Sequence, residues 1–226
     1  MRKRVWWIVA GVIVVIALVI GVGPWAYAKF LHGDQPDALH LPGNPAPAAA
    51  DGVLDGAWTV SPGSRAGYEV WETLSGQRTF VRGQTDRVTG AATVQDSMLT
   101  TGNIEVDVAS IATDDGRRDT MFDTLVMNTA SHPTATFAIS QPVDLTALPG
   151  DGTTITVPVD GKLTLRGQAR DVTTNFQVRR SGETIETAGA IDTVWTDYHI
   201  NKPTLFPNIV VEDAGQVQFS IVLSMG

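Results

Sequence analysis

The sequence predicts an all-β domain of antiparallel strands, either a sandwich or a closed barrel, behind one N-terminal membrane-spanning helix. Three observations support this: an uncharged apolar run near the N-terminus, alternating apolar and polar residues over most of the remaining chain, and turn dipeptides at hairpin spacing. The 226 residues are 43% hydrophobic and 18% charged, which favours one folded domain and argues against a disordered chain.

Residues 1–30 form the predicted signal anchor. The basic cluster Arg2–Arg4 precedes an uncharged, largely apolar run, Val5–Ala28, which as a helix would span about 36 Å and cross a hydrocarbon core of about 30 Å. The basic cluster places the N-terminus in the cytoplasm and the rest of the chain outside, in a single-pass cell-membrane protein. The alternative is a signal peptide cleaved after Ala28, giving a secreted protein. The length of the apolar run favours the uncleaved anchor.

Residues 31–55 form a predicted tether rich in Pro and Ala, without the periodicity of a folded core. We place the start of the folded domain between Ala50 and Gly56, so that the domain covers residues 56–226.

Alternation with a period of two predicts the strands of this domain. The clearest alternation covers residues 104–108, 163–165, 176–178 and 217–223, and weaker alternation covers 67–74, 79–88, 91–99, 134–140 and 184–195. Dipeptides typical of turns separate several of these runs: Asp151–Gly152, Asp160–Gly161, Arg166–Gly167 and Ser181–Gly182. Eight or more strands in about 170 residues predict a sandwich or a closed barrel.

One segment, residues 113–126, departs from this alternation. Its apolar residues fall on one face at helical spacing: Met121, Phe122, Leu125 and Val126. We expect a short helix capped by Thr113 or Asp114, lying against the sheet or over an opening.

Composition excludes several classes of protein. The net charge is −8, and it falls to about −11 without the three basic residues of the N-terminal cluster, which argues against nucleic-acid binding. The chain has no cysteine, and its four histidines are scattered, so the sequence predicts no metal site and no cofactor. None of the common catalytic or nucleotide-binding motifs occurs.

Eight pieces of the chain, in this order, together resemble the YceI-like family of polyisoprenoid-binding, lipocalin-like proteins. They are Gly56–Ser61, Ile104–Thr113, Arg118–Asp119, Leu125, His132–Phe137, Val159–Gly167, Val194–Ile200 and Val217–Leu223. The sequence departs from the family at His199, where a glycine is usual. The resemblance implies an antiparallel, lipocalin-like β-barrel that holds a long isoprenoid, of quinone or polyprenyl type, in an apolar tunnel without catalysis.

From this resemblance and the apolar pattern we predict a set of ligand-binding residues. The apolar candidates are Phe122, Leu125, Val126, Phe137, Leu165, Phe176, Trp195 and Phe219, and the charged candidates are Arg118 and Asp119. For the apolar residues the alternative is plain core packing. For Arg118 and Asp119 it is an ion pair that fixes the start of the helix. We expect Trp58 to plug one end of the barrel.

Two other functions stay open at this point. One is a membrane-anchored interaction module with a filled barrel and no lipid. The other is an enzyme that uses Asp119 and His132 as an acid–base pair. The sequence identifies neither a protein partner nor the headgroup, chain length and recipient of a lipid.

Overall fold

The computed structural model describes residues 22, 35–46, 54–74, 76–202 and 209–226. The predicted membrane anchor, apart from Val22, lies outside the described residues. Within the described ranges, no helix is long and apolar enough to cross a membrane.

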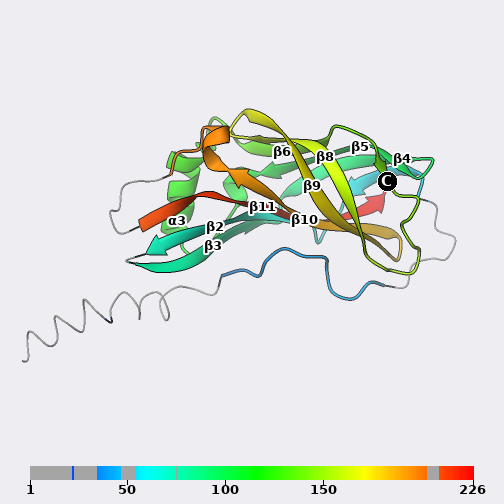
Figure 1. Ribbon diagram of the computed structural model, residues 1–226, viewed down its shortest axis with the longest axis horizontal. Helices are drawn as coiled ribbons and strands as arrows, with labels where there is room; N and C mark the ends of the chain where they lie inside the picture. The colour runs from blue at the N-terminus through cyan, green and yellow to red at the C-terminus, as the bar shows by residue number, and fades with distance from the viewer. Residues whose placement is uncertain (1–21, 23–34, 47–53, 75, 203–208) are drawn as a thin grey trace, which may run out of the picture.

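Eight antiparallel strands close into a barrel (Figure 1). In order around the barrel they are β1 (Gly56–Val60), β4 (Val88–Gln95), β5 (Met98–Asp107), β6 (Thr134–Ile139), β8 (Ile155–Leu165), β9 (Gln168–Ser181), β10 (Thr184–Val194) and β11 (Ile209–Met225). Strand β1 closes the barrel because it pairs with β4 on one edge and with β11 on the other. The prediction of an antiparallel barrel is confirmed, and the sandwich alternative is wrong.

Strand β11 is long enough to pair with two strands in succession along one edge. Its first part pairs with β2 (Arg65–Leu74), and its last residues pair with β1. Strand β3 (Gln77–Thr85) pairs with β2 and extends the wall, and the short β7 (Val143–Asp144) pairs with β5. The barrel is therefore closed at the β1 end, while the β2–β3 hairpin forms the wall of the other end.

Among the described residues, four short helical segments interrupt the strands: η1 (Val108–Ser110), α3 (Gly116–Met121), η2 (Phe122–Val126) and η3 (Trp195–Tyr198). The predicted helix is confirmed, although it is divided between α3 and the π-helical η2. Its N-cap is Asp115, whose side chain accepts a hydrogen bond from the backbone N of Arg117, so neither Thr113 nor Asp114 is the cap. Figure 1 shows α3 at the end of the barrel opposite the C-terminus.

The predicted turns are right in three places and wrong in one. Asp151–Gly152 lies in a turn before β8, with a φ angle of 86° at Gly152. Arg166–Gly167 and Ser181–Gly182 connect strands, with positive φ angles of 47° at Arg166 and 59° at Gly182. Asp160–Gly161 is not a turn, because β8 runs through it. A turn at Asp96–Ser97, with φ angles of 52° and 58°, divides the predicted strand 91–99 between β4 and β5.

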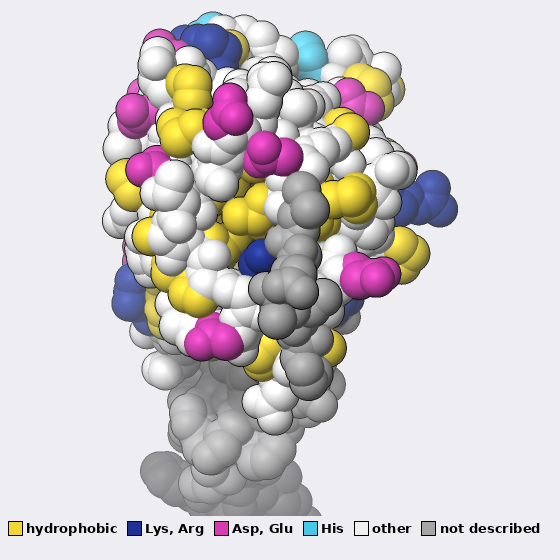
Figure 2. Space-filling view, turned by 90° about the vertical axis from the view of Figure 1, so that its right-hand side faces the viewer, with side chains coloured by type: hydrophobic (Ala, Val, Ile, Leu, Met, Phe, Trp, Pro, Cys, Tyr) yellow, Lys and Arg dark blue, Asp and Glu magenta, His cyan; other side chains and the backbone are white. Residues whose placement is uncertain are grey.

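Apolar residues that face inward form two core clusters, one toward each end of the barrel. Trp58 belongs to the cluster at the closed end, where it is 4% exposed and donates a hydrogen bond from Nε1 to the carbonyl O of Leu54, at 2.9 Å. Trp195 belongs to the cluster beneath α3 and η2. Seen from the closed end, hydrophobic side chains gather near the middle of the face, and acidic side chains are spread over it (Figure 2).

Residues 35–46, within the predicted tether, lie extended along the outside of the barrel, and we call them the strap (Figure 1). At its first residue, Gln35 Oε1 accepts a hydrogen bond from the backbone N of Arg82 at 3.0 Å. At its last, the backbone N of Ala46 donates to Ser181 Oγ at 3.0 Å. The strap therefore runs from the middle of β3 toward the turn between β9 and β10.

The strap covers buried polar side chains on the outer face of the barrel. Arg179 forms an ion pair with Glu186, and its Nη2 also donates hydrogen bonds to the carbonyl oxygens of Pro42 and Gly43 in the strap. The side chains of Arg179 and Glu186 are 8% and 10% exposed. Polar pairing, rather than apolar packing alone, thus holds the strap to the barrel.

Candidate binding cavity

A cavity of about 760 Å³ occupies the half of the barrel beneath α3. This volume lies within the range of about 300–1,000 Å³ that is typical of small-molecule sites. Inward-facing side chains of the strands form its wall, among them Val70, Val81, Val106, Leu165 and Val217. Side chains of the helical segments form its cover: Met121, Phe122 and Val126.

A second cavity of about 130 Å³ lies deeper, toward the closed end. Five residues line both cavities: Ala66, Val106, Ala135, Leu165 and Val217. The two spaces are therefore neighbours along the barrel interior. The lining of the deeper one is almost entirely apolar and includes Trp58.

Glycines opposite aromatic rings help keep the larger cavity open. A Cβ atom at Gly83 would lie 2.5 Å from Cε1 of Tyr68, and one at Gly215 would lie 2.3 Å from Cζ2 of Trp195. The Tyr68 and Trp195 rings therefore lie against the barrel wall, in the space that a side chain at position 83 or 215 would fill. Tyr68 also stacks on Phe122, with ring centroids 5.0 Å apart, which fixes η2 to the wall.

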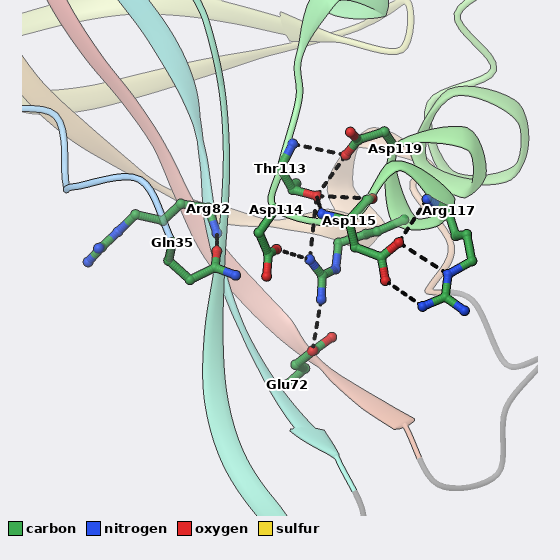
Figure 3. Close-up of polar contacts among 9 residues, drawn as sticks. Gln35, Glu72, Arg82, Thr113, Asp114, Asp115, Arg117 and Asp119 are labelled. Carbon is green, nitrogen blue, oxygen red and sulfur yellow. Dashed lines mark hydrogen bonds and ion pairs between the residues drawn. The ribbon is translucent and has the colours of Figure 1, made fainter. Parts of the chain in front are cut away.

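A buried ion cluster lines the larger cavity at the end beside α3, which we call the mouth. Arg118 Nη1 lies 2.5 Å from Asp114 Oδ1, and its Nη2 lies 3.6 Å from Glu72 Oε1 (Figure 3). The side chains of Arg118, Asp114 and Glu72 are 19%, 4% and 9% exposed. Burial makes any unpaired charge costly, so the two carboxylates are needed to hold this guanidinium in place.

The loop before α3 is fixed by two further carboxylates (Figure 3). Asp119 Oδ1 accepts hydrogen bonds from the backbone N and the Oγ1 of Thr113, at 2.9 and 2.7 Å. Asp115 accepts from the backbone N of Arg117 at 2.9 Å. Arg118 and Asp119 therefore each fix the start of the helix, but through different partners. The alternative from the sequence, an ion pair between these two residues, is not what the structure shows.

Two groups near the mouth have shifted pKa values. Burial raises the pKa of the Tyr68 hydroxyl, so this phenol stays neutral over the physiological range. The hydrogen bond from the Arg117 side chain, followed by that from its backbone N, lowers the pKa of Asp115. Within the part of the chain that the structure describes, no group of His, Asp and Glu side chains is placed to hold a metal ion.

The structure places the predicted site residues in three groups. The larger cavity is lined by Arg118, Phe122, Val126, Leu165 and Trp195. The smaller cavity is lined by Phe137, Leu165, Phe176 and Phe219. Leu125, which is 52% exposed, and Asp119 line neither cavity. Whether these residues contact a ligand stays a prediction.

Sequence reasoning missed the polar wall of the larger cavity. Tyr68 and Glu72 line it together with Val70, because the three alternate on the inward face of β2. This alternation could have identified Tyr68 from the sequence as an inward-facing residue. Nothing in the local sequence indicated that Glu72 would meet Arg118. His132, proposed above as an acid–base partner of Asp119, lines neither cavity.

An eight-stranded antiparallel barrel with a ligand-sized cavity beneath a short helix belongs to the class of β-barrels whose interior has room for one small ligand. The YceI-like domain family matches residues 58–223. The chain therefore belongs to the YceI-like family, as its sequence motifs predicted.

Two solved structures are similar in fold. The first is a polyisoprenoid-binding domain from Saccharophagus degradans implicated in plant cell wall breakdown. It has a TM-score of 0.61 and 20% identity, over 75% of this chain and 98% of that one. The second is BcnA from Burkholderia cenocepacia, with a TM-score of 0.53 and 19% identity, over 69% of this chain and 95% of that one. No curated protein sequence matches the chain.

Proposed function

We propose that this protein binds a long-chain isoprenoid lipid inside its barrel and acts as a carrier or store outside the cytoplasm. The observation that carries this proposal is the pair of neighbouring apolar cavities, of which only the larger is lined by charged side chains among the residues that the structure describes. A lipid with one polar end and one long apolar end matches this arrangement. The polyisoprenoid-binding domain of similar fold supports the isoprenoid class.

The energetics favour a carrier that exchanges with a membrane. Burying apolar surface contributes about 0.8 kcal/mol per CH₂ relative to water, so a prenyl chain would not leave the barrel for water. The bilayer interior is equally apolar, so transfer between membrane and barrel changes the free energy little. Loading and release are then reversible where the mouth meets a membrane.

The charges at the mouth favour an uncharged headgroup such as a quinone. Each cationic side chain that lines the larger cavity stands beside a carboxylate: Arg117 with Asp115, Arg118 with Asp114 and Glu72, and Lys202 with Asp213. A polyprenyl phosphate would compete with these carboxylates for the cations. A quinone needs only hydrogen-bond donors, and the neutral Tyr68 hydroxyl is one.

We also propose that residues 5–28 anchor the protein and that the mouth of the cavity faces the membrane. The strap supports this orientation. Its first residue, Gln35, lies beside Arg82 (Figure 3). The carbonyl O of its last residue, Ala46, accepts a hydrogen bond from the backbone N of Gly182 near the closed end. The N-terminal end of the strap thus lies on the half of the barrel that holds the mouth, where Val81, next to Arg82, lines the larger cavity.

Native mass spectrometry of the full chain, purified from membranes in detergent, tests the lipid. We expect a bound species whose mass, after organic extraction, shows a ladder of isoprene units on a quinone head. An unliganded mass, with no uptake of quinone from added vesicles, would contradict lipid binding and favour the interaction module. Resistance of the protein to alkaline carbonate extraction, together with an intact N-terminus, tests the anchor separately.

A further inference from the structure

Three phenylalanine rings and two glycines form a band across five neighbouring strands, which we call the aromatic belt. In strand order it consists of Phe137 on β6, Gly161 on β8, Phe176 on β9, Gly189 on β10 and Phe219 on β11. Phe176 is its centre, with ring centroids 5.6 Å from Phe137 and 4.5 Å from Phe219. The rings therefore stand on alternate strands, and the glycines lie between them.

The two glycines let the rings lie across the neighbouring strands. A Cβ atom at Gly161 would lie 2.3 Å from Cζ of Phe137, and one at Gly189 would lie 2.8 Å from Cζ of Phe219. Real side chains do not approach this closely, so any other residue at either position would displace a ring. The Phe137 ring thus accounts for a glycine at position 161 in the interior of strand β8.

The belt stands where the larger cavity ends. Ala135 and Val217 line both cavities, and the next inward residues on their strands are Phe137 and Phe219. All three rings line the small cavity and none lines the large one. Phe137 and Phe219 also pack against both core clusters. The rings thus occupy the barrel interior where the cavity of about 760 Å³ ends and the cavity of about 130 Å³ begins.

We infer that the aromatic belt limits the length of the lipid chain that the barrel accepts, with Phe176 as the residue that sets this limit. The inference rests on the proposed function above. A chain that enters at the polar mouth extends through the larger cavity and ends against the three rings. Beyond the rings only the cavity of about 130 Å³ remains, so the rings restrict how many further isoprene units fit.

The test is a length competition with a mixture of polyprenols that differ by one isoprene unit. The full chain in detergent is incubated with the mixture, and native mass spectrometry reads which lengths remain bound. We expect the wild-type protein to bind up to a limiting length. In Phe176→Ala the ratio of the next longer to the limiting polyprenol should rise at least about tenfold, a change of about 1.4 kcal/mol.

Two further variants make the result specific. Phe80→Ala removes the same ring from β3, where Phe80 packs on Trp71 and lines neither cavity, and it should keep the wild-type length limit. Phe176→Leu retains more of the core and should shift the limit in the same direction if Phe176→Ala does not fold. A folded Phe176 variant with the wild-type length profile overturns the inference alone. A wild-type protein that binds no polyprenol and no quinone overturns the proposed function as well.

Discussion

The indole ring of Trp195 lies against the backbone of Gly215, at the point where β11 resumes its pairing with β2 after an irregularity. A Cβ atom at position 215 would lie 2.3 Å from Cζ2 of Trp195 and 2.4 Å from the carbonyl O of Glu69. A methyl group here would displace the Trp195 ring, which lines the larger cavity, or the backbone carbonyl of Glu69, which belongs to the paired strand β2. Gly215 therefore keeps both the strand pairing and the cavity in place.

Gly215→Ala should accordingly destabilise the fold by about 1–3 kcal/mol, the usual cost of overpacking. Urea unfolding followed by tryptophan fluorescence measures this change. Gly102→Ala is the matched control, because a Cβ there meets only Ile139, at 3.7 Å, in ordinary contact. Equal unfolding midpoints for the two variants would show that the Trp195 contact does not constrain position 215.

Arg118→Met should destabilise the protein by a few kcal/mol, up to the about 3–5 kcal/mol that is typical when one member of a buried ion pair is lost. The reason is that the side chains of Asp114 and Glu72, which have little access to water, would lose this cationic partner. Arg117→Met is the control, because the Arg117 side chain is 83% exposed and its pairing with Asp115 is screened by solvent. Chemical denaturation of both variants measures the difference, and similar losses would contradict the assigned cluster.

Most of the barrel could be predicted from the sequence, because each strand buries one face and so shows a period of two. The errors arose where the decisive partner is distant in sequence. Asp160–Gly161 has the composition of a turn, but Phe137 on another strand requires the glycine. His199, where the sequence resemblance predicts a glycine, adopts a left-handed φ of 54°, a conformation that glycine reaches without strain.

The sequence predicted which types of residue line the candidate site better than it predicted which of them meet. Aromatic and aliphatic residues at inward positions were expected to line a tunnel, and most of them do line one of the two cavities. Parity along a strand does not tell which residues meet across the barrel, so the cluster of Arg118 with Asp114 and Glu72 was not predicted. Leu125 shares the helical spacing of Phe122 and Val126 but faces solvent, because the π-helical turn of η2 changes the spacing.

Acid should remove the contribution of Asp115 to stability. The pKa of Asp115 is lower in the folded state than the value of about 3.9 for an unfolded aspartate. Its contribution is therefore present above pH about 4 and is lost as the pH falls through the folded pKa. Asp115→Asn keeps a capping oxygen but not the charge. We expect it to be less stable than the wild type at neutral pH, with the difference vanishing in acid. A difference that stays constant across a pH series of urea titrations would contradict this.

The strap should depend on the buried pair of Arg179 and Glu186. Arg179→Met leaves the Glu186 carboxylate without its cation and removes the donor to Pro42 and Gly43. We expect a loss of about 3–5 kcal/mol in stability and faster proteolysis within residues 35–46. The double variant Arg179→Met/Glu186→Met removes the buried charge altogether, so it should recover much of the stability while the strap stays sensitive to protease, because its carbonyl groups still lack a donor. Recovery of both properties would mean that the barrel holds the strap without Arg179.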